Sequence, residues 1–176
     1  MMKYAASLVA KGYAKKTIRN YLAVVGSIFR FAVLEGIVES SPVLDIQVTK
    51  GKPSQKRKPA TKEDIKAVLS NHDDLMGILL MAFLFTGMRW GEALALRGKD
   101  ILEGKIQITR SVYDYHNHSK EKTPKTESGI RVIILPEILS KILPKVKPEE
   151  FVFSTHPATP MKKSEYDSLM RKYRKK

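Results

Sequence analysis

The chain has no cysteine among its 176 residues. This excludes a disulfide-stapled fold and every zinc module built on cysteine ligands, and it is typical of a reducing compartment. Long apolar runs are missing too: the longest, from Leu75 to Phe85, contains Gly77 and is too short to span a bilayer. The first residues lack the layout of a signal peptide. We therefore expect a cytoplasmic protein that makes no use of a membrane.

Acidic residues are scarce relative to basic ones. The chain carries 18 Asp and Glu against 32 Lys and Arg, which gives a formal net charge of +14. Residues 1–60 hold 11 basic and 3 acidic residues, residues 61–160 hold 14 and 13, and residues 161–176 hold 7 and 2. A near-neutral middle with basic flanks favours a polyanionic partner, with nucleic acid ahead of an anionic membrane. Basic ends that only aid solubility are the alternative, although acidic residues serve that purpose better.

Apolar spacing predicts a mostly helical chain. From Thr17, the expected N-cap, to Leu34, apolar residues recur every three or four positions, and Gly36 is expected to end the helix. A shorter helix before Gly12 should precede this one. Further helices are expected over residues 61–71, 75–86 and 90–96, after Pro136, and from Lys162 onward.

Two segments predict strands instead. Residues 105–112 alternate polar and apolar side chains, and residues 131–135 are rich in β-branched residues. A short strand over residues 123–126 would pair between them and complete a three-stranded meander. The expected fold is mainly α with a small antiparallel β-sheet (α+β).

A proline- and lysine-rich segment divides the chain. Residues 49–60 carry five basic residues and no acidic residue: Lys50, Lys52, Lys56, Arg57 and Lys58. Its prolines and like charges favour an extended linker. We expect a partial helical domain over residues 1–48 and a second domain over residues 61–176. The linker either is simply solvated or lies along a phosphate backbone, and the basic neighbouring segments favour the second possibility.

The segment from Thr86 to Leu94 carries the most specific chemical signal. An apolar helix is expected to stop at Gly87, and a second helix begins just after Arg89. A guanidinium fixed at such a corner can bind phosphate oxygens in a bidentate manner. Glu92 would orient or partly neutralise it. The alternative is a local ion pair between Arg89 and Glu92 that only stabilises the helix junction.

Three segments together resemble the tyrosine recombinase (phage integrase) family. TGMRWGEALALRGKDI resembles the first arginine box, TPKTESGIRVIILP the β-hairpin lysine segment, and KKTIRNYLAVVGSIFRFAVLEGIVESSPV the helical core-binding domain. The resemblance spans nearly the whole chain in the right order. The positions that match the arginine box are Thr86, Gly87, Arg89, Glu92, Leu96 and Asp100.

The resemblance implies roles for individual residues. Arg89 matches the first catalytic arginine, which binds the scissile phosphate, and Glu92 matches its supporting acid. Lys125 matches the catalytic lysine, which protonates the leaving 5′ oxygen, with Lys120 and Lys122 as rival candidates. This chemistry needs fixed positive charge and an acid, so we expect no cofactor and no metal. The residues expected to contact DNA are Lys15, Lys16, Arg19, Lys56, Arg57, Lys58, Lys120, Lys122 and Arg131.

The sequence also departs from the family pattern. The family's second box, His-x-x-Arg, does not occur after any of the four histidines, His72, His116, His118 and His156. Tyr166 and Tyr173 precede the place where that box would begin, so we interpret them as helix-surface residues rather than nucleophiles. We expect a chain truncated before the second box and the nucleophile. His116 and His118 lack a third metal ligand and are expected to face solvent.

We therefore expect a chain that binds double-stranded DNA without cleaving it, in a bacterial or phage-infected cell. The full-length protein would form a tetramer on DNA, as the family does, and this chain would be a monomer or weak oligomer. The alternatives are a non-catalytic duplex-DNA-binding regulator on the same scaffold, or a basic module that binds RNA or a membrane surface.

Overall fold

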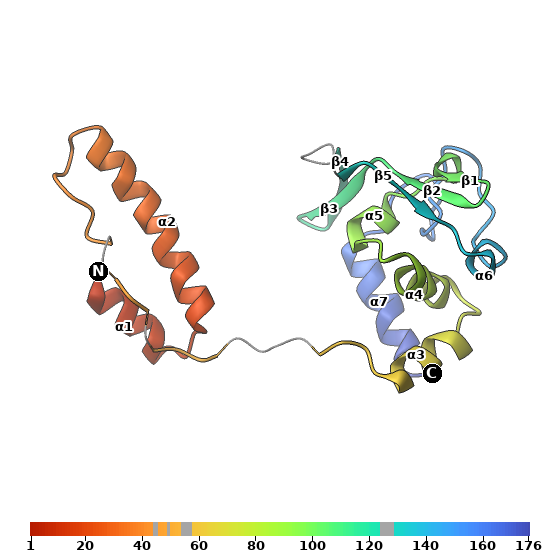
Figure 1. Ribbon diagram of the computed structural model, residues 1–176, viewed down its shortest axis with the longest axis horizontal. Helices are drawn as coiled ribbons and strands as arrows, with labels where there is room; N and C mark the ends of the chain where they lie inside the picture. Colours follow the sequence, from red (N-terminus) through yellow and green to blue (C-terminus); the bar gives the residue numbers. More distant parts are fainter. Residues whose placement is uncertain (44–45, 49, 54–57, 124–128) are drawn as a thin grey trace. The chain divides into compact units, whose positions relative to one another are not determined.

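The computed structural model describes residues 1–43, 46–48, 50–53, 58–123 and 129–176. The chain divides into two compact units, Met1–Pro59 and Ala60–Lys176, each with a hydrophobic core of its own (Figure 1).

Two helices form the N-terminal unit. α1 spans Met2–Ala10 and α2 spans Lys15–Leu34. Gly12 joins them with a φ of +77°, a left-handed conformation that a residue with a Cβ adopts only with strain. The buried residues of this core are Leu8, Ile18 and Leu22. Such a small core buries little of a 20-residue helix.

Helix α2 differs from its prediction in two respects. It begins at Lys15 with Ala14 as the N-cap, so Thr17 lies inside the helix rather than capping it. Its apolar face is also largely exposed, because α1 and the segment after α2 cover only one side: Ile28 is 63% exposed and Phe31 is 61% exposed. By length and composition alone α2 could cross a membrane, although it carries Arg19 and Arg30.

Three helices open the C-terminal unit as the sequence predicts. α3 spans Lys62–Ser70, α4 spans Leu75–Thr86 and α5 spans Trp90–Leu94. Thr61 and Asp64 form the expected capping box: the Thr61 hydroxyl accepts a hydrogen bond from the Asp64 amide, and Asp64 accepts one from the Thr61 amide. Helix α4 is apolar on nearly every side because it runs through the core.

The strands form one small sheet and one separate hairpin. β1 (Ile101–Leu102), β2 (Lys105–Ile108) and β5 (Arg131–Ile134) pair antiparallel in the order β1-β2-β5. β3 (Ser111–Tyr115) and β4 (His118–Lys122) form a separate two-stranded sheet, in which, among the described residues, each pairs with the other. The fold is thus mainly α with small antiparallel sheets, which confirms the predicted α+β class.

The predicted meander is wrong in its pairing. β2 pairs directly with β5, with Ile108 opposite Arg131, and the hairpin β3–β4 is inserted between them in sequence. The hairpin was not predicted because its second strand, β4 (HSKEK), is polar and lacks the apolar alternation of a half-buried strand. Thr123 is not in a strand, and the rest of the predicted strand over residues 123–126 lies outside the described residues.

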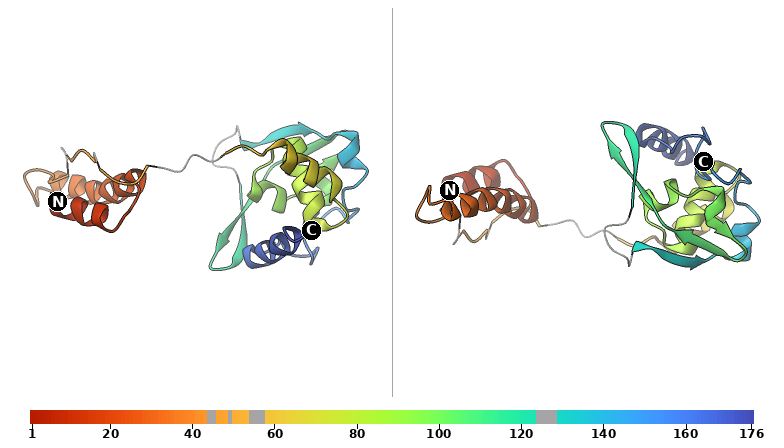
Figure 2. Two further views of the ribbon diagram at one scale, coloured as in Figure 1. Left: turned by 90° about the horizontal axis from the view of Figure 1, so that it is seen from below. Right: turned by 90° about the horizontal axis from the view of Figure 1, so that it is seen from above.

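Two helices complete the C-terminal unit. α6 spans Glu137–Ser140 and begins after Pro136 as expected, and α7 spans Lys163–Tyr173. α7 packs against α4, and the two further views show it beside the β3–β4 hairpin (Figure 2). Hydrogen bonds support this neighbourhood, since the Ser164 amide donates to Asn117 Oδ1 over 3.2 Å.

Candidate nucleic-acid interface

Arg89 lies at the corner between α4 and α5. Gly87 ends α4 with a φ of +62°, the left-handed C-cap that glycine adopts at no steric cost. Arg89 is the N-cap residue of α5, and its side chain is 76% exposed. The chain therefore holds the backbone of Arg89 in a rigid turn and leaves its guanidinium open to solvent.

Close packing fixes the position of α5. A Cβ on Gly91 would lie only 2.3 Å from the Val112 carbonyl oxygen and 2.5 Å from Ser111 Oγ. Only glycine lets this helix approach β3 so closely. The helix that follows Arg89 is thus pressed directly against the hairpin.

Glu92 is the centre of the site. Its side chain is only 6% exposed, and each of its two carboxylate oxygens accepts two hydrogen bonds. Arg131 on β5 donates from both terminal nitrogens, to Oε1 over 2.9 Å and to Oε2 over 2.7 Å. Arg89 donates its backbone N–H to Oε2 and one guanidinium N–H to Oε1, each over 2.8 Å. One carboxylate therefore binds both arginines.

These hydrogen bonds set the charge of Glu92. Burial by itself raises the pKa of this carboxyl group, but the hydrogen bonds from Arg131 and Arg89 outweigh burial and lower the pKa to about 2. Glu92 in turn raises the pKa of Arg131. At neutral pH the site is thus a fixed anion between two cations, with one net positive charge.

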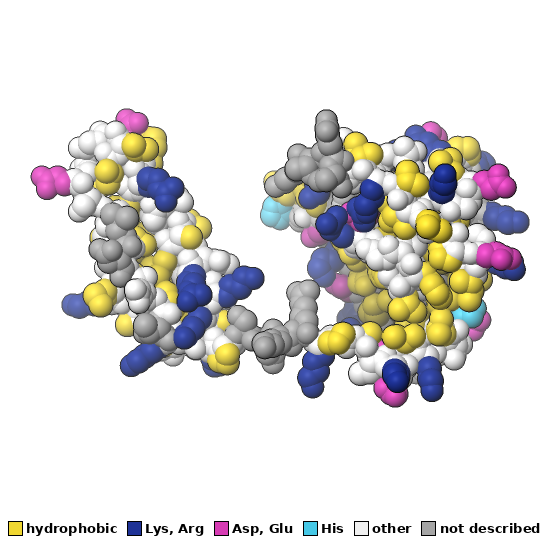
Figure 3. Space-filling model, viewed as in Figure 1, with side chains coloured by type: hydrophobic (Ala, Val, Ile, Leu, Met, Phe, Trp, Pro, Cys, Tyr) yellow, Lys and Arg dark blue, Asp and Glu magenta, His cyan; other side chains and the backbone are white. Residues whose placement is uncertain are grey.

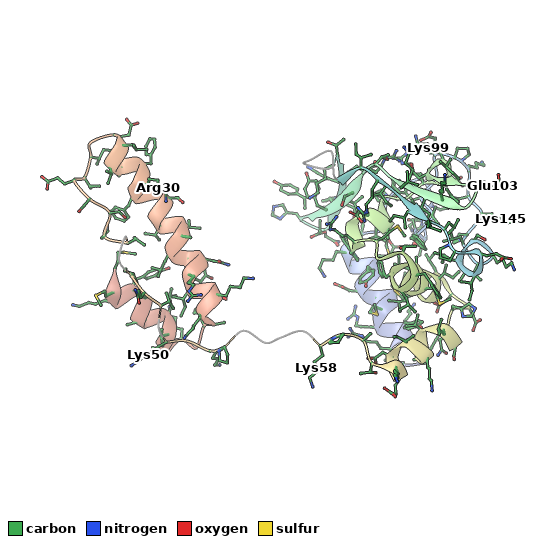
Figure 4. All side chains as sticks on the ribbon, viewed as in Figure 1. Arg30, Lys50, Lys58, Lys99, Glu103 and Lys145 are labelled. Carbon is green, nitrogen blue, oxygen red and sulfur yellow. The ribbon has the colours of Figure 1, made fainter. Side chains whose placement is uncertain are left out.

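The other predicted site residues fall into three groups: some are exposed, one binds Glu92, and some lie outside the described residues. Lys120 and Lys122 lie on β4 and are exposed. Arg131, which we expected to contact DNA, directs its guanidinium to Glu92. Lys125, Lys56 and Arg57 lie outside the described residues, and Lys58 is exposed ahead of α3 (Figure 4).

The basic residues predicted in the N-terminal unit lie at the start of α2. Lys16 and Arg19 are exposed, and Lys15 is half-buried. The Lys15 backbone N–H donates to the Lys52 carbonyl over 3.1 Å, so the residues after the unit's core return to the N-terminus of α2. This arrangement groups the predicted lysines of α2 with Lys52.

Tyr166 and Tyr173, both on α7, are half-buried, so each also packs inward from the helix surface. The Tyr166 ring meets Trp90 edge-on at a centroid distance of 5.8 Å, and both tyrosines contact the core. Burial raises the pKa of each phenol. They are better explained as packing residues of α7.

Sequence reasoning missed two features of this surface. The first is the partnership between Arg131 and Glu92, which only the fold reveals because 39 positions separate the residues. The second is the pair of exposed tyrosines on β3, Tyr113 and Tyr115. Their alternate spacing in SVYDY was an available signal for a strand with one aromatic face.

Comparison with known proteins finds curated relatives of the chain. No family model matches the chain. It is 28% identical to the prophage integrase IntR of Escherichia coli (strain K12) over 130 residues. This match covers 71% of this chain and 30% of the integrase. The chain is 30% identical over 145 residues to the ICEBs1 integrase of Bacillus subtilis (strain 168), covering 80% and 39%. A XerC-like tyrosine recombinase of Caldanaerobacter subterraneus is 29% identical over 166 residues, covering 84% and 41%.

Solved structures share the fold. The Tn1549 transposon integrase in complex with circular intermediate DNA matches with a TM-score of 0.80 at 21% identity, over 98% of this chain and 62% of that one. A lambda integrase tetramer bound to a Holliday junction matches with a TM-score of 0.65 at 14% identity, over 97% and 50%.

The curated relatives are named as integrases or tyrosine recombinases, in agreement with the resemblance of the sequence segments. The chain belongs to the tyrosine recombinase (phage integrase) family. It spans 30% to 41% of the length of the curated relatives named above.

Proposed function

We propose that this chain is a DNA-binding part of a site-specific tyrosine recombinase of a phage or mobile element. The observation that carries the proposal is the exposed guanidinium of Arg89, held at a fixed corner by a buried, ionised carboxylate. A guanidinium so placed offers a phosphate two parallel N–H donors with little loss of conformational entropy.

The relatives support the chemistry that we assign to the full-length protein. There a tyrosine would attack the scissile phosphate, and a 3′-phosphotyrosine would form before strand exchange. Arg89 would stabilise negative charge on the phosphate oxygens, and Lys125 would protonate the leaving 5′ oxygen. Arg131 would hold the Glu92 carboxylate in position, because its guanidinium donates two hydrogen bonds to that carboxylate.

The 176 residues contain no His-x-x-Arg sequence. We accordingly propose that this chain binds duplex DNA and does not cleave it, as a monomer or weak oligomer in the cytoplasm, associated with the nucleoid. The tetramer on DNA is proposed for the full-length protein. A non-catalytic regulator on the same scaffold would bind DNA in the same way and differs only in what the complete gene encodes.

The test is a binding assay with four probes: duplex DNA, single-stranded DNA, RNA and vesicles with anionic headgroups. We expect the tightest binding to duplex DNA in a fluorescence anisotropy titration. Arg89→Ala should weaken duplex binding about tenfold, the effect of losing a charge-assisted hydrogen bond. Its unfolding free energy should change little, because the side chain is mostly exposed.

Lys145→Ala is the matched control. It also removes one exposed positive charge, from a residue drawn on the opposite side of the unit from β3 and β4 (Figure 4). Equal binding to all four probes would contradict the proposal, as would equal losses for the two variants. Incubation with duplex DNA should give no covalent protein–DNA adduct on a denaturing gel.

A further inference from the structure

The β3–β4 hairpin has two chemically different faces. A two-residue turn, His116-Asn117, closes it, with φ of 50° and 59°, the geometry that matches the twist of the paired strands. Tyr113 lies opposite Lys120, and Val112 lies opposite Glu121. Because side chains alternate along each strand, these two pairs fall on opposite faces.

The inner face of the hairpin packs on the rest of the C-terminal unit and is bonded to it. Val112 is buried in the core, and Ser119 Oγ donates to the Met161 carbonyl over 2.7 Å. Glu121 forms an ion pair with Arg97. The carboxylates of both strands, Glu121 and Asp114, belong to this inner face by their alternation.

The outer face is basic and aromatic. It carries Tyr113, Tyr115, His118, Lys120 and Lys122, with no carboxylate among the side chains of β3 and β4 on this face. Figure 3 shows Lys and Arg side chains gathered near this part of the unit. The separation of acidic and basic residues across the hairpin leaves an outer surface complementary to a polyanion.

Each lysine of this face crosses diagonally onto a tyrosine ring. Lys120 Nζ lies 4.4 Å from the Tyr115 centroid, and Lys122 Nζ lies 5.4 Å from that of Tyr113. The tyrosines remain 38% (Tyr113) and 52% (Tyr115) exposed. Cross-strand pairs of this kind stabilise a hairpin. Hairpin stability alone, however, does not require all the acidic side chains to lie on the other face.

We propose that this outer face binds a DNA strand whose bases are locally unpaired, with the lysines on its phosphates and the tyrosine rings stacked on its bases. Residues two apart on a strand are about 7 Å apart, which leaves room for one flat base between the two rings. A base that enters displaces a flexible lysine side chain, whose ammonium group then reaches the neighbouring phosphate. Base–aromatic stacking tolerates any sequence, so the face would select for unpaired structure rather than for sequence.

The inference rests on the proposed function, because it assumes that the chain binds DNA. Its test compares two fluorescent duplexes of equal length and charge, one fully paired and one with a short central run of mismatches. The wild-type chain should bind the mismatched duplex about five-fold or more tightly than the paired one, given the usual strength of stacking on one base. The double variant Tyr113→Ala/Tyr115→Ala should lose this preference and keep its affinity for paired duplex.

Three further variants separate stacking from folding, from charge and from the loss of any exposed tyrosine. Tyr113→Phe/Tyr115→Phe keeps the rings and should keep the preference. Lys120→Ala/Lys122→Ala should weaken binding to both duplexes and lower the salt dependence by about two phosphate contacts. Tyr21→Ala, which removes a similarly exposed tyrosine from α2, should leave the preference intact.

Equal wild-type affinity for the two duplexes would overturn the inference while leaving the proposed function standing. Loss of the preference in the phenylalanine variant would also overturn it, because the rings would still be present. Absence of binding to either duplex would instead reject the proposed function itself.

Discussion

At the scale of single residues, Glu92 determines how this site behaves. A nearly buried carboxylate is costly unless it is paired, and here four hydrogen bonds from two arginines compensate its burial. The backbone N–H of Arg89 is among the donors, so the charge of Glu92 also closes the first turn of α5. Removing that charge should therefore affect stability as well as DNA binding.

We expect Glu92→Gln to lower the free energy of unfolding by about 2–3 kcal/mol at pH 7, which is the order of the free energy linked to the lowered pKa. The pKa of Glu92 is about 2 in the folded protein against an ordinary value of 4.5. Its stabilising contribution is therefore complete above about pH 4.5 and is lost as the pH falls toward 2. Urea unfolding of the two proteins at several pH values measures this difference.

The control is Arg131→Met, which removes two of the hydrogen bonds and keeps the carboxylate. In this variant the pKa of Glu92 should rise, so the loss of stability on acidification should begin at higher pH than in the wild type. If the stability difference between wild type and Glu92→Gln is the same at pH 7 and pH 2, the lowered pKa does not stabilise the fold.

At the scale of secondary structure elements, the contact between α5 and β3 links the arginine corner to the hairpin. Gly91 makes this contact possible, since it faces the Val112 carbonyl at a distance no other residue tolerates. The same contact orients Arg89 and the hairpin within one rigid block. A displacement of α5 should therefore disturb both surfaces together.

Gly91→Ala should destabilise the C-terminal unit by about 1–3 kcal/mol, because the added methyl group forces α5 away from β3. Chemical unfolding followed by circular dichroism measures the change. Gly26→Ala on α2 is the matched control: its Cβ would meet Val43 at 3.7 Å, an ordinary contact, and alanine favours a helix. Equal destabilisation by the two substitutions would contradict the packing argument.

The elements also show what the sequence could and could not predict. The capping box at Thr61, the apolar helix α4 and its stop at Gly87 follow from local rules, and all are confirmed. The arginine corner was found by the same means. The pairing of β2 with β5 and the Arg131–Glu92 contact were missed, because both depend on residues distant in sequence. The start of α2 was misplaced, because no side chain caps it.

At the scale of the whole molecule, the excess of basic over acidic residues is distributed unevenly along the chain. Residues 1–60 hold 11 basic residues against 3 acidic ones, whereas residues 61–160 are almost balanced. Within residues 61–160, ion pairs such as Lys99–Glu149 and Arg110–Asp100 neutralise part of the positive charge. A large share of the free positive charge is therefore carried by the N-terminal unit and the last residues.

This distribution predicts strongly salt-dependent binding to duplex DNA. If six to ten phosphates are contacted, affinity should fall by about 10³–10⁵ between about 50 and 200 mM salt, because condensed counterions are released on binding. An anisotropy titration over this range gives the slope. Affinity that does not change with salt would show that the positive excess takes no part in binding.

The double clamp on Glu92 has a consequence for how Arg89 can act. If Arg89 turns its side chain from Glu92 toward a phosphate, the carboxylate still accepts two hydrogen bonds from Arg131 and one from the Arg89 backbone. No anion is then left without a counter-charge, so Arg89 exchanges one oxygen acceptor for another at small energetic cost. Glu92 thus holds one N–H of the Arg89 guanidinium, and Arg131 would keep Glu92 paired if Arg89 turned toward a phosphate as we propose.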